Sequence, residues 1–250
     1  MINLKTDREI SIMKEGGKKL RAVVGDLLPL IRAGVSTKEI DDKAEQLIKK
    51  QGGESSFKTV SGYKFSTCLP INEQIVHTKP SKRVLKDGDV LTLDIGMLYK
   101  GLHTDYAVTK VIGGSSKDEK INKFLKTGEE TLYLAIKKAV IGNRLGSISE
   151  VIEREIVGNG YFIIKELTGH GIGKKLHEDP YVFGYVDKPI NKTPLINKGL
   201  VIAIEVIYAM GTDIMVYEKD NWSIITKDRS VSACFEHTIA VTDNGPIILT

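Results

Sequence analysis

The sequence predicts an α+β fold built from two similar halves, each with two helices and an antiparallel sheet. Three observations favour this class: helical periodicity occurs in pairs, apolar strand-like segments follow each pair, and the whole pattern recurs at a fixed interval. The predicted halves are residues 1–112 and 113–250, with a Gly-Gly-Ser-Ser linker at 113–116. With 250 residues the chain can bury a sizeable core, so we expect one domain.

Helix starts are marked by a Ser or Thr that is followed three residues later by Glu, the pattern of a capping box. These pairs are Thr6 with Glu9, Ser36 with Glu39, Ser116 with Glu119, and Ser147 with Glu150. Apolar residues at helical spacing follow each pair, and glycines mark the breaks between helices. We therefore expect two helices in each half.

The two halves match at an offset of 111 residues, which aligns helix caps, chain breaks and apolar strand-like runs. The superposed pairs include Ser36 with Ser147, Gly88 with Gly199, and Asp94 with Glu205. Chance identity is the alternative, but the agreement of several kinds of feature favours a duplicated half. The offset therefore superposes two carboxylates, Asp94 and Glu205, that both lie in apolar runs.

Two aspartates fall in a predicted β-hairpin. Asp94 belongs to the apolar run at 90–95, Asp105 lies in the next strand, and residues 99–101 suit a turn. With a turn on residues 99 and 100, Asp94 would lie directly opposite Asp105. Facing carboxylates among apolar side chains repel each other, so one must be protonated or a cation must lie between them. An exposed hairpin with two solvated aspartates is the alternative.

A second acidic pair favours a metal site. Glu205 and Glu236 also lie in apolar segments, and duplicated halves would bring all four carboxylates to a shared centre. His170, in a Gly-rich segment at 168–173, can add a nitrogen ligand, although a lone histidine in such a loop is more often a packing residue. Four carboxylates and one imidazole suit divalent Mn, Fe, Co or Zn, and two such ions that share a water form a hydrolytic site.

Composition argues against several other classes. The net charge of +4 is too diffuse for sequence-specific DNA binding, and 6% aromatic residues are too few for a base-stacking platform. Cys68 and Cys234 form neither a zinc ribbon nor a disulfide framework, which favours a reducing, cytoplasmic location. No apolar run reaches about 18 residues, and residues 1–9 lack a signal core, so we expect neither membrane insertion nor export.

The five candidate ligands, in this order and in these local sequences, resemble the methionine aminopeptidases of the creatinase-like, or pita-bread, superfamily. The resemblance extends over residues 7–250 and is carried by the segments 66–73, 93–96, 168–173 and 236–238. The short interval between His177 and Glu205 resembles type I, and the start of the fold near residue 7 resembles its short bacterial-style form. The implied fold is a pita-bread fold, with one catalytic domain around a central dinuclear metal site.

The resemblance also implies roles for individual residues. Two divalent ions (Co, Mn, Fe, Zn or Ni) would be held by Asp94, Asp105, His170, Glu205 and Glu236. Glu205 would move the proton of a water that bridges the ions, His177 would polarise the scissile carbonyl group, and His77 would steady the scissile amide or the tetrahedral intermediate. The implied substrate-binding residues are Tyr63, Cys68, His77, His177 and Trp222. The Asn72 carbonyl and Ser232 would hold a Na or K ion.

The implied activity is removal of the initiator methionine from nascent proteins whose second residue is small, by attack of the bridging water or hydroxide. Leu176 and Val60 stand where family members often carry an aromatic residue, which bears on the second residues accepted. The implied partners are nascent polypeptide N-termini, with transient ribosome contact, for a monomeric enzyme. The alternatives are a prolidase or aminopeptidase P, which would carry a further N-terminal domain, and a non-catalytic pita-bread binding module, which would lack ligands.

Overall fold

The computed structural model describes residues 2–250; Met1, with which the predicted first half begins, lies outside the described residues. Two helix pairs are present, as predicted: α1 (Asp7–Leu27) with α2 (Thr37–Lys50), and α3 (Glu119–Ile136) with α4 (Gly146–Gly158). Short 3-10 turns η1, η2 and η3 lie at Leu28–Leu30, Phe57–Thr59 and Ile190–Lys192. Within residues 2–250, no helix combines the length and apolar character needed to cross a bilayer.

The strands form one large sheet and one small sheet, and the pairings are antiparallel. The central strands of the large sheet are β4 (Val90–Tyr99), β5 (Leu102–Val111), β12 (Ser232–Thr242) and β9 (Val201–Ala209), in that order. Shorter strands flank them: β1 (Glu54–Ser55), β2 (Thr67–Cys68), β6 (Phe162–Ile163), β7 (Gly169–Gly171), β8 (Glu178–Val182) and β13 (Gly245–Ile248). The small sheet contains β10 (Met215–Tyr217), β11 (Ile224–Thr226) and β3 (Gln74–Ile75).

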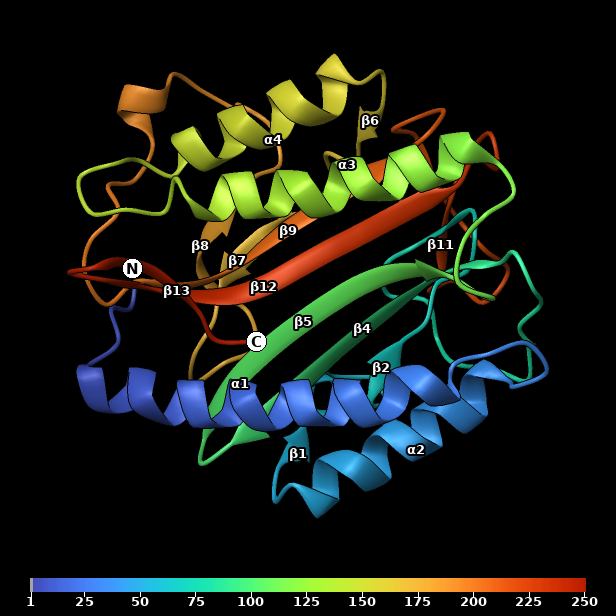
Figure 1. Ribbon diagram of the computed structural model, residues 1–250. Coiled ribbons are helices and arrows are strands. Elements are labelled where there is room, and N and C mark those ends of the chain that lie inside the picture. Colours follow the sequence, from blue (N-terminus) through green and yellow to red (C-terminus); the bar gives the residue numbers. More distant parts are fainter. Residues whose placement is uncertain (1) are drawn as a thin grey trace.

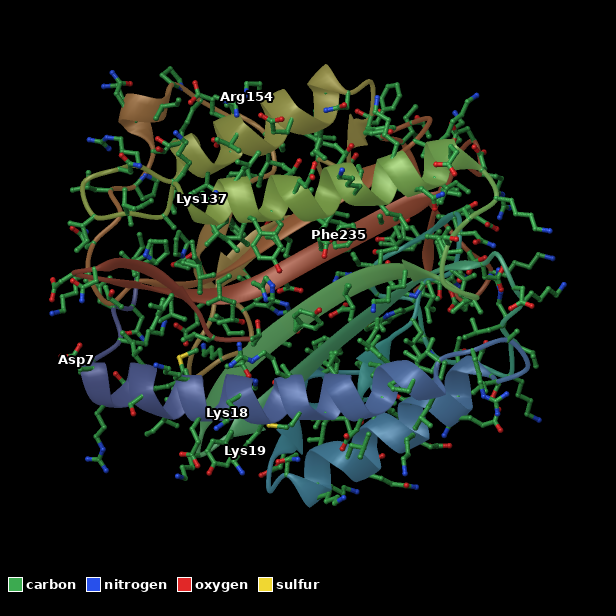
Figure 2. All side chains as sticks on the ribbon, viewed as in Figure 1. Asp7, Lys18, Lys19, Lys137, Arg154 and Phe235 are labelled. Carbon is green, nitrogen blue, oxygen red and sulfur yellow. The ribbon has the colours of Figure 1, made fainter. Side chains whose placement is uncertain are left out.

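The helices cover one face of the large sheet. Helix α1 packs on β4 and β5, and α3 packs on β9 and β12, so each half supplies its own cover (Figure 1). Successive strand residues point to opposite faces, and Phe235 of β12 lies on the face beneath α3 (Figure 2). The neighbouring residue Glu236 therefore points to the other face of the sheet. That face holds the candidate functional residues.

The capping boxes of the first half are confirmed, and those of the second half are wrong. Thr6 and Ser36 cap α1 and α2 as predicted. Helix α3 is capped by Asp118, whose side chain accepts from the Lys120 N–H, and the expected cap Ser116 lies two residues before it. Helix α4 begins at Gly146 without a side-chain cap, so Ser147 lies inside its first turn.

The duplication has two offsets rather than one. The predicted offset of 111 holds where the long strands begin: Gly88 and Gly199 have φ of 88° and 86°. Before the second helices the equivalent glycines are Gly34 and Gly142, 108 positions apart, with φ of 87° and 89°. The Gly34 N–H donates to the Leu85 carbonyl, as the Gly142 N–H donates to that of Ile196. The predicted equivalence of Ser36 and Ser147 is therefore wrong, because three residues separate the two registers.

The register of the β4–β5 hairpin also differs from the prediction. Lys100 and Gly101 form the turn, with φ of 50° and 78°, the positive values that a tight two-residue hairpin turn requires. Tyr99 therefore pairs with Leu102. Further along the hairpin, Asp94 pairs with Ala107 and Asp105 pairs with Gly96. The two aspartates lie diagonally on one face rather than directly opposite each other.

Gly128 in α3 is a packing constraint that a stability measurement can test. A Cβ at position 128 would lie 2.2 Å from the hydroxyl oxygen of Tyr208, which is fully buried and donates to the Phe124 carbonyl. We expect Gly128→Ala to lower the free energy of unfolding by about 1–3 kcal/mol through overpacking, despite the better helix propensity of alanine.

The matched control is Gly25→Ala in α1, where a Cβ would meet no atom within 4 Å. This variant should be unchanged or more stable by about 0.5–1 kcal/mol. Urea unfolding followed by circular dichroism measures both variants. Equal effects of the two substitutions would contradict the packing argument.

Candidate metal centre and substrate cavity

Four residues form one row across the central strands of the sheet. Asp94 on β4 pairs with Ala107 on β5, Ala107 pairs with Glu236 on β12, and Glu236 pairs with Glu205 on β9. Asp105 lies two residues before Ala107, so its side chain points to the same face and lies diagonal to both neighbours. The methyl side chain of Ala107 leaves room at the centre of the four carboxylates.

His170 reaches the same centre from β7, which pairs with the far edge of β9. Its Nε2 atom lies 3.5 Å from Oε1 of Glu205. Its Nδ1 atom lies 2.9 Å from the carbonyl oxygen of Gly171, and since a carbonyl only accepts, Nδ1 carries the proton. Burial lowers the pKa of His170 to about 4, so the neutral ring directs an Nε2 lone pair at the carboxylates. That is the arrangement of a histidine metal ligand.

The four acids lie in an environment that opposes their ionisation. Burial, and then the neighbouring Asp105, Glu205 and Asp94, raise the pKa of Glu236 well above its ordinary value. Burial and the other acids likewise raise the pKa values of Asp94 and Glu205, and burial raises that of Asp105 to about 7. Oε1 of Glu236 is buried without a hydrogen-bond partner. A cation at the centre would satisfy this oxygen and offset the repulsion.

The donor geometry fits a divalent ion. One ligand atom each from Asp105, His170 and Glu236 lies within 4.8 Å of the others. Carboxylate oxygens with one imidazole nitrogen suit borderline and hard divalent ions, whereas a structural zinc site would favour thiolates. The predicted ligands from both halves are thus brought together, and the residues fit a divalent metal.

A cavity of about 130 Å³ opens on this centre. It is lined by every predicted catalytic, metal and substrate-binding residue and by four further apolar side chains. The predicted residues are Tyr63, Cys68, His77, Asp94, Asp105, His170, His177, Glu205, Trp222 and Glu236, and the apolar additions are Phe57, Val60, Val76 and Leu176. Phe57 and Val76 were not predicted, because neither lies in a motif that singles it out.

Aromatic residues form one wall of the cavity. Tyr63 and Trp222 stack with ring centroids 5.5 Å apart and an interplanar angle of 25°. The Tyr63 hydroxyl donates to the Thr67 carbonyl at 2.7 Å and lies 3.2 Å from Sγ of Cys68. These bonds hold an apolar surface next to the metal centre, a combination that suits an unbranched apolar side chain on a peptide.

His77 and His177 keep exposed surface within the cavity, where a substrate can reach them. The His177 ring packs against His170 with centroids 4.5 Å apart. The protein around each ring reduces its hydration and so disfavours the charged form. This lowers the pKa of His77 to about 4 and also lowers that of His177, so both rings are neutral at pH 7. His77 has a φ of 70°, a conformation that is uncommon for residues other than glycine and that is found at functional sites.

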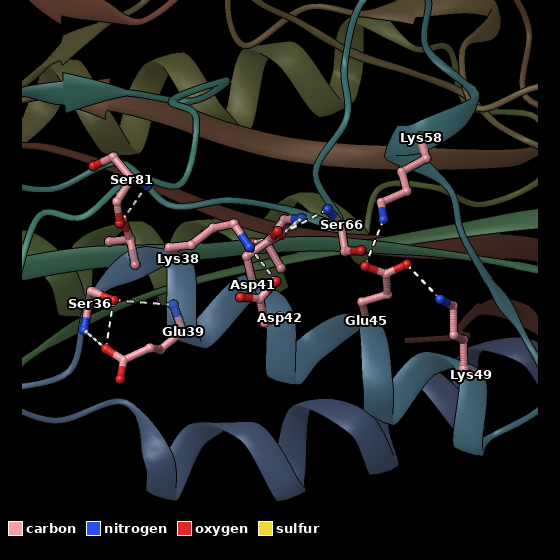
Figure 3. A network of polar contacts seen from close by, with 12 residues as sticks. Ser36, Lys38, Glu39, Asp41, Asp42, Glu45, Lys49, Lys58, Ser66 and Ser81 are labelled. Atoms are coloured by element: carbon pink, nitrogen blue, oxygen red, sulfur yellow. Dashed lines mark hydrogen bonds and ion pairs between the residues drawn. The ribbon is translucent and has the colours of Figure 1, made fainter.

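Asp41 supports the cavity wall, and the sequence analysis did not identify it. This residue lies on the buried face of α2, and its Oδ1 accepts from the Ser66 N–H at 2.8 Å, the Thr67 N–H at 3.0 Å and the Thr67 hydroxyl at 2.9 Å (Figure 3). These bonds fix the start of β2 and hence Cys68. An aspartate between Ile40 and Ala44 on the apolar face of a helix is the signal that could have revealed it.

The predicted monovalent-cation residues lie together but do not line the cavity. The Ser232 N–H donates to the Asn72 carbonyl at 2.9 Å, and the Ser232 hydroxyl donates to the Gln74 carbonyl at 2.7 Å. Asn72 has a φ of 59° and is held by its own side chain, which accepts from the Val90 N–H.

The buried acids make the metal-free protein sensitive to pH. Because the pKa of Glu236 is raised in the folded state, stability is retained below its ordinary pKa of 4.5 and lost as the pH rises. We expect Glu236→Gln to make the metal-free protein more stable by about 1–3 kcal/mol at pH 8, and by much less at pH 5. Urea unfolding in the presence of a chelator measures this difference.

The matched control is Glu150→Gln, which changes an exposed acid on α4 and should have little effect at either pH. Added divalent ions should stabilise the wild-type protein more than Glu236→Gln, because a ligand stabilises the state that binds it. Equal stability of the wild-type protein and Glu236→Gln at pH 8 would contradict the proposed repulsion.

The sequence profile of metallopeptidase family M24 matches residues 11–243. The protein named methionine aminopeptidase 1 from Bacillus subtilis is 42% identical over 250 residues, with coverage of 100% of this chain and 99% of that protein. The methionine aminopeptidase of Clostridium perfringens is 38% identical over 250 residues, with the same coverage.

Solved structures confirm the predicted pita-bread fold. The methionine aminopeptidase of Thermotoga maritima matches with a TM-score of 0.95 and 36% identity, over 100% of this chain and 99% of that chain. The prolidase of Pyrococcus furiosus matches with a TM-score of 0.80 over 99% of this chain and 65% of that chain, but its 23% identity supports the fold alone. Since the family profile and full-length relatives cover nearly every residue, the chain belongs to metallopeptidase family M24.

Proposed function

We propose that this protein is a metal-dependent aminopeptidase that removes the initiator methionine from polypeptides whose second residue is small. Membership of family M24 implies the use of divalent metal. The observation that carries the proposal is the single cavity in which the acid and histidine cluster adjoins the stacked wall of Tyr63 and Trp222. That wall suits the flexible, polarizable side chain of methionine.

The rival activities have less support. The relatives that cover both chains almost completely are named methionine aminopeptidases, whereas this chain covers only 65% of the Pyrococcus prolidase. A non-catalytic module would not need the ligand set, and here all five predicted ligands line one cavity. Retention of both exposed histidines in that cavity also favours catalysis.

The proposed ligands of two divalent ions are Asp94, Asp105, His170, Glu205 and Glu236. When bound at such a site, divalent ions acidify a water molecule and reduce the charge that develops on the carbonyl oxygen. Co, Mn, Fe, Zn and Ni all suit these donors, and metal analysis of the isolated protein would distinguish them. The Asn72 carbonyl and the Ser232 hydroxyl are proposed to add a Na or K site, which is supported by the nearby Gln74 carbonyl.

Three residues are proposed to act on the reacting peptide. The Glu205 carboxylate, whose pKa is raised by burial and then by Asp105, can take a proton from the attacking water and hold it near neutral pH. His177 would donate a hydrogen bond to the oxygen of the scissile carbonyl group, where negative charge develops. His77 would bind the amide nitrogen on the leaving side.

We further propose that residues 1–112 and 113–250 act as one catalytic domain, because both halves supply ligands to one cavity. The proposed partners are the N-termini of nascent polypeptides. A monomeric state, a cytoplasmic location and transient contact with the ribosome are also proposals, the last supported only by the net charge of +4. Sedimentation measurements, fractionation and ribosome pelleting test them in turn.

Peptide hydrolysis tests the proposed activity. After chelation and reloading with each candidate metal in turn, the protein should release methionine from Met-Gly-Met. It should act at least about tenfold more slowly on Met-Leu-Met, because a larger second residue must fit beside the metal centre. Cleavage of Xaa-Pro dipeptides alone, or no cleavage with any of the metals, would exclude this function.

The role of Glu205 has a separate test. Glu205→Gln should lower kcat by roughly 10²–10⁴-fold, because the amide cannot accept the proton of the attacking water. Glu150→Gln should keep wild-type activity, and circular dichroism should show that both variants are folded. Wild-type kcat in a folded, metal-loaded Glu205→Gln variant would refute the proposed role.

A further inference from the structure

A buried ion pair includes Glu178, the residue that follows the cavity residue His177 in the chain. Nζ of Lys5 lies 2.7 Å from Oε2 of Glu178, and the two side chains are only 2% and 9% exposed. Among the lysine and arginine ion pairs of residues 2–250, no other pair has both side chains this buried. Two buried charges lose their hydration, and their mutual attraction offsets this loss only when their geometry is good. Buried pairs of this kind are therefore uncommon in proteins.

Glu178 joins this pair to the loop that carries cavity residues. The loop connects β7 to β8 and ends in Leu176 and His177, whose side chains line the cavity. Oε1 of Glu178 accepts from the Lys175 N–H at 3.0 Å, while Oε2 accepts from Lys5. Burial alone would raise the pKa of Glu178, but the bonds from Lys5 and the backbone lower it, so the carboxylate is charged. One carboxylate therefore holds the loop and the lysine together.

Lys5 is itself fixed to the framework of the site. Its N–H donates to the Gly199 carbonyl at 2.7 Å, two residues before β9, and its Nζ also donates to the Asn3 carbonyl at 2.9 Å. Gly173 leaves the space that the pair occupies, because a Cβ there would lie 2.4 Å from Cε of Lys5 and 3.0 Å from Oε1 of Glu178. The segment before α1 thus bonds to the loop through the ion pair and, through the Lys5 backbone, to the residue two positions before the strand that carries Glu205.

We propose that Lys5 is a positioning residue that, through Glu178, holds His177 at the scissile carbonyl group. The proposal rests on the function proposed above, in which His177 donates to that carbonyl. Without the lysine charge, Glu178 would be a buried carboxylate with no counter-charge, and it would turn towards water and release the Lys175 N–H. The loop would keep its strand pairing between Gly171 and Glu178 but lose the side-chain bond to the Lys175 N–H. His177, which lies between Lys175 and Glu178, would then shift relative to the substrate.

Kinetics of three Lys variants test this proposal in the full-length, metal-loaded protein. Lys5→Met keeps an unbranched side chain as far as Cε and removes the charged ammonium group, and Lys5→Arg keeps the charge. We expect Lys5→Met to lower kcat on Met-Gly-Met by about 10–100-fold with little change in KM, because displacement of a reacting group by about 1 Å can cost this much. Lys5→Arg should restore most of the activity. Lys198→Met is the matched control, since the Lys198–Asp243 pair is exposed, and it should leave kcat unchanged.

The same substitutions in a His177→Ala variant distinguish a positioning role of Lys5 from a general contribution to stability. If Lys5 acts through His177, Lys5→Met should lower kcat by less than about twofold in protein that already carries His177→Ala, because coupled residues are not additive. Glu178→Gln should follow the same pattern in both backgrounds, and it serves as the second variant if Lys5→Met does not fold. Thermal unfolding and metal content of each variant show that folded, loaded protein is compared.

The outcomes distinguish this inference from the proposed function. An equal loss of kcat in the wild-type and His177→Ala backgrounds would overturn the positioning role while leaving the activity intact. Full activity of a folded Lys5→Met variant would overturn it as well. Absence of Met-Gly-Met cleavage by the wild-type protein with every metal would instead overturn the proposed function.

Discussion

The structure around the candidate metal centre depends on the electrostatic cost of four carboxylates, three of them buried and Glu205 nearly so, on one face of one sheet. Among the described residues 2–250, the ion-pair partner of this group is His170, a neutral imidazole at pH 7 that supplies no counter-charge. Such a cluster is unstable when it is ionised, and it becomes favourable when its acids are protonated or when a cation occupies its centre. The fold therefore holds together acids whose ionisation costs stability, and the helix-covered core on the other face must supply the stability that this ionisation removes.

The spacing of the acids follows from strand pairing. A row that runs from Asp94 through Ala107 and Glu236 to Glu205 places the acids on neighbouring strands, and one small side chain in that row leaves the centre open. Asp105 reaches the centre diagonally, opposite a glycine: a Cβ at Gly96 would lie 3.2 Å from its Oδ1. The small residues Ala107 and Gly96 are thus as necessary for this cluster as the acids themselves, because the carboxylates need room to converge.

The sequence allowed prediction of the helix pairs, the long strands and the identity of the clustered acids, because these depend on local periodicity and on charge within apolar runs. The predicted hairpin register was wrong because the turn residues are Lys100 and Gly101 rather than residues 99 and 100. Both adopt the positive φ values that a two-residue hairpin turn requires. The second-half caps were wrong because Asp118 rather than Ser116 caps α3, and because α4 already begins at Gly146, which places Ser147 inside the helix. Asp41 and Lys5 were missed, since their partners lie 26 and 173 positions away; the position of Asp41 on an apolar helix face indicates burial but not its partner.

The two halves of the sheet meet along β5 and β12, where Glu236 pairs with Ala107, His237 pairs with Tyr106, and the hydroxyl groups of Thr238 and Thr109 add bonds across the junction. The proposed ligands lie on both sides of this junction, and Asp94 and Glu236 are 142 positions apart in the sequence. Assembly of the centre therefore requires contacts between distant parts of the sequence. The chain loses the conformational entropy of closing a long loop before metal binding can stabilise the folded state. During synthesis, the centre cannot form until β12 has left the ribosome and docked. The enzyme can thus gain activity only after nearly all of its own sequence has folded.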